Sequence, residues 1–279
     1  MKSILKKIVG RIFASRLKKI NQLKNVEKGK TCYIFGDGVS LKWYDLKKFK
    51  NFDSISLSYL PFHKNFNDIN CKYCLLIQPW FFYKFRIIPD PTNRGKNLKN
   101  IFWYNKLGDY FKKNVINRYK KIIFITNLSN YFSLKKSTNN IFVLNQFEDK
   151  IFDKILKKKN LTAWNGSLYG GVLFAIYLGY KKIFLVGCDY LDEKPYSGHW
   201  YEKDSGIPLL PSKSLAKSFI KSLSDIVDIQ IITRKYDGSN KKYTSYKNHT
   251  GHDLDYKNRD KIINKKNLNI LKNWPDPRI

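Results

Sequence analysis

The residues Gly36-Asp37-Gly38, followed by Ser40, are the first in this chain whose types and spacing can do chemistry. They follow an apolar run at 31–35 that predicts a short β-strand. Without a Cβ, glycines at such a turn let backbone amides approach a phosphate or a ribose. Ordinary strand-to-helix turns also contain paired glycines, so the turn alone indicates only a phosphate-binding turn. Since a carboxylate repels phosphate, we expect Asp37 to accept from ribose hydroxyls or a base N–H.

Four more motifs follow this turn, and the five together resemble one family. They are Gln78-Pro79-Trp80-Phe81-Phe82, Asn165-Gly166-Ser167 before a small-residue helix ending in Leu178-Gly179-Tyr180, Gly187-Cys188-Asp189-Tyr190, and Gly198-His199. Their order over residues 31–233 is similar to that of the bacterial lipooligosaccharide sialyltransferases. In that family a Gly-Asn-Gly-Pro-Ser-Leu turn, a Pro-x-Phe-Phe element, a glycine- and serine-containing loop, a Gly-x-Asp-Phe strand end and a Gly-His pair follow in this order.

The resemblance implies a glycosyltransferase that uses a CMP-activated sialic acid or related nonulosonate as donor. The acceptor would be a cell-surface glycan or glycolipid, as in lipopolysaccharide or capsule biosynthesis, and the mechanism would be inverting and metal-independent, with no cofactor. His199 would be the general base, because histidine has an ordinary pKa of about 6.5. The hydroxyls of Tyr196 and Tyr190 would stabilise the leaving nucleotide, although strict alignment puts Leu191 at the second position.

The same resemblance assigns a nucleotide-binding role to a set of residues at the strand ends. These are Gly36, Asp37, Gly38, Ser40, Ser58, Gln78, Pro79, Asn165, Gly166, Ser167 and Asp189. Several positions depart from the family pattern: Asp37 replaces Asn, Val39 replaces Pro, Ser58 stands where Asn is expected, and Trp164 lies near the place of an Arg. These departures keep the reaction class and leave the identity of the donor sugar open.

The apolar pattern from residue 31 onward predicts alternating strands and helices. The predicted strands cover 31–35, 54–58, 73–78, 122–126, 141–144, 183–187 and 228–233, and the predicted helices 149–159, 167–178 and 212–224. Such alternation is typical of a mostly parallel sheet with helices on both faces, which binds ligands beyond the C-terminal ends of its strands. We therefore expect an α/β, Rossmann-like fold, and the resemblance implies the GT-A-variant type, with a catalytic domain at 28–234 and a lid or tail at 235–279.

The segment 1–27 is a separate, basic, amphipathic unit. Apolar residues recur at helical spacing from Ile4 to Leu23, residues 1–25 contain eight Lys and Arg residues, and the first acidic residue is Glu27. This pattern is typical of a helix lying in a membrane interface. We expect residues 1–25 to bind an anionic membrane and to place the protein in the cytoplasm, peripherally at the inner face of the cytoplasmic membrane. A helix packed on the protein's own core, or at a dimer contact of a homo-oligomer, is the alternative.

The charge of the chain is unusual for a globular protein. Its 279 residues include 53 Lys and Arg against 22 Asp and Glu, which gives a net charge of +31. Such a balance attracts polyanions, including nucleic acid. The aromatic residues, however, fall in core-like patterns and no nucleic-acid reading motif is present, so no nucleic-acid partner is expected, and a basic nucleic-acid-binding protein is an alternative. Cys71-x-x-Cys74 lacks a second pair at zinc-ligand spacing, and we expect the four cysteines to be reduced core residues.

Two other interpretations stay open. The domain also resembles the hydroxymethylpterin pyrophosphokinase-like proteins, whose ATP-dependent transfer needs carboxylate-held Mg²⁺. Asp37 and Asp189 would have to be the Mg²⁺ ligands in such a protein, and no acidic cluster is evident in the sequence. The second is the polar run 248–253, in which His249 and His252 could ligate a metal or supply another base.

Overall fold

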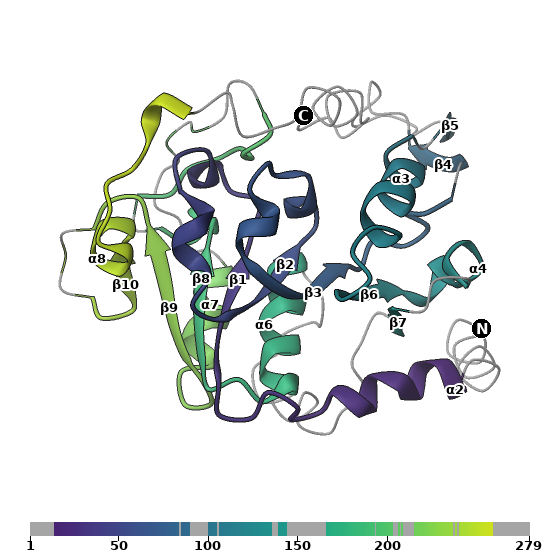
Figure 1. The fold of residues 1–279 in the computed structure, drawn as a ribbon, viewed down its shortest axis with the longest axis horizontal. Coiled ribbons are helices and arrows are strands. Elements are labelled where there is room, and N and C mark those ends of the chain that lie inside the picture. The colour runs from purple at the N-terminus through teal and green to yellow at the C-terminus, as the bar shows by residue number, and fades with distance from the viewer. Residues whose placement is uncertain are drawn as a thin grey trace.

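The computed structural model describes residues 14–83, 85–89, 100–104, 106–135, 139–143, 166–192, 194–202, 206, 208, 215–236, 238 and 240–258. Its centre is one eight-stranded sheet with the order β10-β9-β8-β1-β2-β3-β6-β7 (Figure 1). Every strand pair in this sheet is parallel. The predicted α/β class with a mostly parallel sheet is therefore confirmed.

Seven of the eight strands of the sheet coincide with predicted ones, within about three residues. The strands are β1 Thr31–Phe35, β2 Asp53–Leu57, β3 Asn70–Leu76, β6 Ile123–Asn127, β7 Asn140–Val143, β8 Lys182–Val186, β9 Asp228–Thr233 and β10 Tyr243–Ser245. A separate antiparallel hairpin, β4 Phe85–Pro89 with β5 Asn100–Tyr104, was not predicted. The helix expected at 149–159 lies outside the described residues.

Helices and short helical turns connect these strands. The α-helices are α2 Ala14–Leu17, α3 Lys106–Phe111, α4 Tyr131–Leu134, α6 Ser167–Leu178, α7 Leu215–Ser222 and α8 Tyr246–Thr250. The 3₁₀ turns are η1 Lys18–Leu23, η2 Val39–Lys42, η3 Leu46–Phe49, η4 Leu60–Phe62, η5 Phe66–Asp68, η8 Leu128–Asn130, η9 Asp189–Leu191 and η10 Tyr256–Asn258, and η7 Lys112–Ile116 is a π-helical turn.

The sheet separates two apolar cores, because alternate residues of a strand point to opposite faces. On one face, Ile34 of β1 and Ile55 of β2 pack with α6 and α7. On the other face, Tyr33 and Phe35 of β1 pack with the turns η2 to η5 and with α3 and α8. Since both faces are covered, the central strands are almost wholly apolar, as their sequence indicated.

Helix α6 is held close to the sheet and brings its first residue to the ligand-binding edge. Gly171 lies so near Leu57 that a Cβ on the glycine would be 2.7 Å from that side chain. The helix ends at Gly179, whose left-handed backbone (φ 93°) only glycine adopts without strain. In a parallel β-α-β arrangement the helix begins beside the C-terminal ends of the strands, so Ser167 lies at the edge where such folds bind ligands.

The described part of 235–279 extends the fold. Strand β10 pairs with β9 in parallel, and α8 places the buried Tyr246 against the core. Expected as a lid or tail, this segment instead adds an edge strand and a covering helix through residue 250. Residues 259–279 lie outside the described residues.

The described part of the N-terminal segment lies along the sheet. Helix α2 runs toward β7 (Figure 1), and Leu23 and Ile20 pack on the core that contains α6. Two positions of the predicted apolar stripe therefore face the protein, as in the alternative interpretation. Residues 1–13 lie outside the described residues, so the membrane-surface helix stays a prediction for them. No helix in the described ranges is long and apolar enough to cross a membrane.

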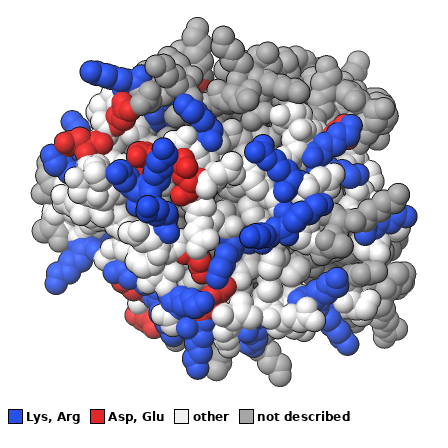
Figure 2. All heavy atoms as spheres, in the orientation of Figure 1, with Lys and Arg blue, Asp and Glu red and all other residues white. Residues whose placement is uncertain are grey.

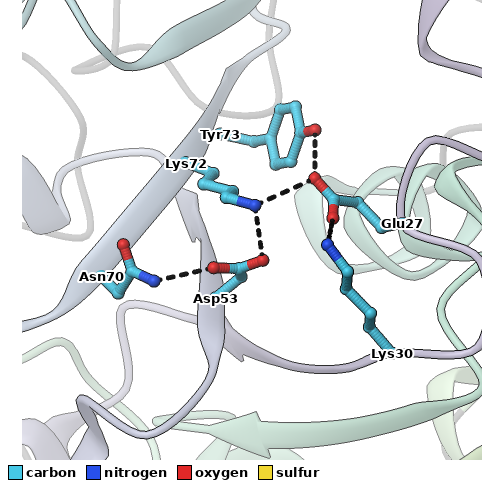
Figure 3. Close-up of polar contacts among 6 residues, drawn as sticks. All are labelled: Glu27, Lys30, Asp53, Asn70, Lys72 and Tyr73. Atoms are coloured by element: carbon cyan, nitrogen blue, oxygen red, sulfur yellow. Dashed lines mark hydrogen bonds and ion pairs between the residues drawn. The ribbon is translucent and has the colours of Figure 1, made fainter.

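A charged network fastens this segment to the N-terminal edge of the sheet (Figure 3). The carboxylate of Glu27, 6% exposed, accepts from Lys30 at 2.8 Å, Lys72 at 3.2 Å and the Tyr73 hydroxyl at 3.0 Å. Lys72 also pairs with Asp53 at 2.7 Å. Burial raises the Glu27 pKa, but the hydrogen bonds from the three donors outweigh it and leave the pKa below its ordinary value.

Replacing Glu27 with Gln is therefore expected to destabilise the fold by about 1–3 kcal/mol, since a charge-assisted bond to the buried Tyr73 is lost. Because the folded pKa is lowered, Glu27 stabilises the fold above its unfolded pKa, and this contribution is lost as the pH falls through the folded value. Urea unfolding from pH 7 to pH 3 should show the difference between wild type and E27Q shrinking with acid. Asp109→Asn, in an exposed pair with Lys113, is the control and should cost under about 0.5 kcal/mol. An E27Q deficit that is unchanged at pH 3 would contradict this role.

Candidate functional site

The glycine turn after β1 is fastened to the end of β8. The amide of Gly36 donates to Val186 O at 2.8 Å, and that of Gly38 donates to Gly187 O at 2.7 Å. A Cβ on either Gly36 or Gly38 would lie 2.5 Å from the Gly187 oxygen. The glycines therefore allow β1 and β8 to approach closely, which is a structural reason for the Gly-x-Gly pattern that the sequence did not reveal.

Asp189 completes this connection. Its Oδ2 accepts the amide of Ser40 at 2.7 Å, and both residues are buried. Burial raises the Asp189 pKa, while Ser40, Arg234 and His199 lower it. The amides of Gly36, Gly38 and Ser40 thus all have acceptors within the protein, so a phosphate at this turn has to be bound by other groups.

Asp37 joins the ends of two strands to the loop that contains His199. Its carboxylate accepts from the Trp200 indole at 3.2 Å, from the Tyr59 amide at 3.4 Å and from the Ser58 side chain. Burial raises its pKa to about 6, and the charge of His199 and these hydrogen bonds counteract the rise. Asp37 therefore accepts from protein groups, and its acceptance from a ribose hydroxyl or a base N–H stays a prediction.

His199 lies directly against this turn, as a backbone bridge between Gly38 and His199 shows. The Glu202 carboxylate is 2.5 Å from His199 Nδ1, and its other oxygen accepts the His199 amide at 2.8 Å. The imidazole stacks on Tyr201, with ring centroids 5.1 Å apart and planes 8° apart. An ionised carboxylate at Nδ1 favours the tautomer with the proton there, which leaves Nε2 as the basic atom. The His199 side chain is 32% exposed.

The two candidate tyrosines occupy different surroundings. The Tyr196 amide donates to Asp189 O at 3.2 Å, and the Arg234 guanidinium lies 3.3 Å from the centroid of its ring. Tyr190 is 43% exposed, and its nearest interacting groups include Tyr169 of α6, on the other core. The structure thus associates Tyr196 with the groups around His199, and places Tyr190 toward α6.

The remaining predicted residues lie at the same edge, over neighbouring elements. Ser58, at φ 53°, directly follows β2. Gln78 and Pro79 are exposed after β3, and the carbonyl of Gln78 accepts from Asn130 at 3.0 Å. Gly166 and Ser167 begin α6, whereas Asn165 lies outside the described residues. These residues therefore share the edge of the sheet, at the ends of β2 and β3 and at the start of α6.

The ring of Tyr59 connects these two regions. It lies 6.3 Å from Phe81, in the Pro79-Trp80-Phe81-Phe82 element, and 5.7 Å from Tyr201, in the His199 loop. Tyr59 is itself buried, so its position is set by the packing on both sides.

Of the two histidines in the 248–253 run, His249 packs against the core and His252 lies at the surface. His249 is within 3.0 Å of the Tyr33 hydroxyl and packs on Phe49 and Phe184, and burial lowers its pKa. His252 is exposed and lines a different cavity from His249. Among the residues that the structure describes, no three His, Cys, Asp or Glu side chains gather as a metal site would require. All four cysteines are free, as expected.

Sequence reasoning missed Glu202, Trp200 and Arg234. The His199–Glu202 spacing of three residues was the available signal for Glu202, because it allows a turn to return the carboxylate to the imidazole. For Trp200 and Arg234 no local pattern exists, since their partners Asp37 and Tyr196 are far away in the chain.

No protein-family model and no curated protein matches the chain by sequence. Solved structures of the sialyltransferase CstII do match. CST-II with a trisaccharide acceptor and CMP is 17% identical over 73% of this chain and 80% of that chain, with a TM-score of 0.41. CstII from Campylobacter jejuni with cytidine-5'-monophosphate is 18% identical over 74% and 79%, also with a TM-score of 0.41. CstII with CMP-3FNeuAc is 16% identical over 73% and 79%, with the same score.

Proposed function

We propose that the chain is a glycosyltransferase in which His199 is the general base. The observation that carries this proposal is the Glu202 carboxylate, which contacts both the imidazole Nδ1 and the backbone amide of His199 beside the glycine turn. A histidine that had only a surface role would not need a carboxylate partner that is itself only 14% exposed, as Glu202 is. The order of the five motifs supplies the reaction class.

In the proposed reaction, an acceptor hydroxyl attacks the anomeric carbon of a nucleotide sugar. The hydroxyl proton passes to His199 Nε2 as the new C–O bond forms, and the bond to the nucleoside monophosphate breaks with inversion. Glu202 stabilises the imidazolium that results. Charge developing on the departing phosphate is stabilised by the hydroxyl of Tyr196. No metal or cofactor is part of this proposal.

The donor would lie across the C-terminal ends of β1, β2 and β3. Ser58, Gln78 and Pro79 lie on this edge. The first amides of α6, beginning at Ser167, have no partners within a helix and attract anions. We keep sialic acid or a related nonulosonate, activated by CMP, as the proposed donor on the strength of the motif resemblance.

The acceptor is proposed to be a glycan or glycolipid at the inner face of the cytoplasmic membrane. Basic side chains spread over the face seen in Figure 2, with fewer acidic ones among them. Such a surface attracts anionic lipid and anionic glycans alike. Peripheral binding through residues 1–25 is the second part of this proposal.

A thermal-shift panel of CMP, UDP, GDP and ATP, each with and without Mg²⁺, tests the proposed function. We expect CMP to raise the melting temperature equally in both conditions, and ligand at about 100 times its Kd corresponds to about 2.7 kcal/mol. The His199→Ala variant is the control, because a base that acts on the acceptor is not needed for CMP binding. Stabilisation by ATP only when Mg²⁺ is present would contradict the proposal and favour pyrophosphoryl transfer.

A further inference from the structure

A cavity of about 350 Å³ opens beside the C-terminal end of β9, next to the His199 loop. Its wall includes Asp192, Lys194, Tyr196, Arg234, Lys235 and Tyr236. Three of these side chains are cationic and two are tyrosines. Its volume is at the lower end of the range for small-molecule sites, where one sugar unit fits.

Arg234 is the best-positioned cation of this cavity. It directly follows Thr233, the last residue of β9, so a rigid strand fixes its backbone. Its guanidinium lies 3.3 Å from the Tyr196 ring centroid and 4.8 Å from that of Trp43. Aromatic faces orient a guanidinium while leaving its N–H edges for planar anions such as carboxylate or phosphate.

Asp192 gives the cavity a buried carboxyl. The residue is 5% exposed, and its Oδ1 has no hydrogen-bond partner among the described groups. Buried polar atoms nearly always have a partner, so an unpartnered oxygen in a cavity wall indicates a ligand donor, such as a sugar hydroxyl. Burial and the neighbouring Asp189 raise the Asp192 pKa, against Arg234 and Lys217.

The cavity adjoins the candidate base. Asp189 interacts electrostatically with both Arg234, in the cavity wall, and His199, so its carboxylate is near both groups. Tyr196 lines the cavity and lies three residues before His199. A sugar in the cavity would therefore be next to the reacting groups.

We infer that this cavity is a substrate subsite for an anionic sugar unit, with Arg234 binding the carboxylate or phosphate and the Asp192 carboxyl binding a hydroxyl. That the bound sugar is a substrate rests on the proposed function, whereas binding of the sugar in the cavity does not depend on sugar transfer. The anionic sugar belongs either to the donor or to the acceptor, and both have the same chemistry.

Ligand-observed NMR titration of the full chain tests this inference, with three free sugars as probes: N-acetylneuraminic acid, its methyl ester and glucose 6-phosphate. We expect at least one of the anionic sugars to bind and the ester to bind at least about 10-fold more weakly, as loss of a charge-assisted pair implies. Arg234→Gln should weaken anionic-sugar binding by a similar factor, and Arg234→Lys by less. Arg118→Gln is the matched control, since Arg118 also lies over a tyrosine ring but not in this cavity.

Three results would overturn the inference: no binding of either anionic sugar, equal binding of the ester, or an Arg234→Gln affinity within about twofold of wild type. If thermal unfolding shows that Arg234→Gln does not fold, the comparison uses Arg234→Lys, which keeps a cation near Asp189. Competition with CMP-N-acetylneuraminic acid then assigns the sugar: displacement places it with the donor, and retained binding places it with the acceptor. If sugar binding depends on Arg234 but the protein has no transfer activity, the proposed function is refuted and the subsite stands. If transfer is unchanged in Arg234→Gln, the subsite is refuted and the proposed function stands.

Discussion

Replacing His199 with Ala is expected to lower the rate of sugar transfer by at least about 100-fold, the usual contribution of a general base. The reason is the His199–Glu202 pair: Nδ1 is held 2.5 Å from the carboxylate, so Nε2 is the atom that can take the acceptor proton. The measurement is kcat with a CMP-activated donor and a soluble glycan acceptor, together with the affinity for CMP. We expect kcat to fall and the CMP affinity to change less than about threefold.

Glu202→Gln separates positioning from catalysis. Glutamine can still bond to the ring but brings no negative charge, so we expect a loss of about 10- to 100-fold in kcat, smaller than for His199→Ala. The acid limb of the kcat pH profile should also shift to lower pH, because the imidazolium loses its proton more readily without the Glu202 charge, a change that a purely structural role would not produce. His252→Ala is the matched control, because this exposed histidine lies on another cavity and should leave kcat unchanged. Wild-type turnover in His199→Ala would end the assignment of the base.

The second large effect is expected from a single methyl group at the glycine turn. A Cβ at position 38 would lie 2.5 Å from Gly187 O and 2.6 Å from Asp189 Oδ2, closer than any stable contact. Relief of this contact separates β1 from β8 and breaks the bond between Ser40 and Asp189. We expect Gly38→Ala to destabilise the fold by about 2–4 kcal/mol, from overpacking and a lost buried hydrogen bond.

Urea unfolding of Gly38→Ala and of Gly171→Ala measures this effect against a matched glycine. The backbone of Gly38 (φ −65°) suits any residue, so strain from a positive φ is not involved. At Gly171 the added Cβ meets only the end of the Leu57 side chain, which can move, and alanine favours the helix by about 1 kcal/mol. A Gly38→Ala loss no larger than that of Gly171→Ala would contradict the close approach of β1 and β8. Because Gly38 also bridges to His199, the variant should lose transfer activity at temperatures where it remains folded.

The strands that lie in the middle of the sheet were predictable because burial on both faces leaves a continuous apolar run. The predicted 228–233 strand is β9 without change, and the predicted 167–178 helix is α6. Strand β10 and helix α8 were not predicted, since Tyr243–Ser245 is a short edge strand with a polar sequence that pairing alone makes a strand. The hairpin of β4 and β5 was missed for the same reason: no periodic pattern marked it.

The features of the candidate site can also be divided into those that the sequence predicts and those that only the tertiary structure brings together. The sequence by itself determined the α/β class, the glycine turn, the His199 candidate and the order of the motifs, because these depend on residue types and on local spacing. Only the tertiary structure decided that the Asp189 carboxylate accepts the Ser40 amide and that the Arg234 guanidinium lies over the Tyr196 ring. It also decided that the Asp37 carboxylate accepts hydrogen bonds from both Trp200 and Tyr59. These pairs are far apart in the chain, and only the parallel sheet, which gathers its C-terminal strand ends at one edge, brings them together.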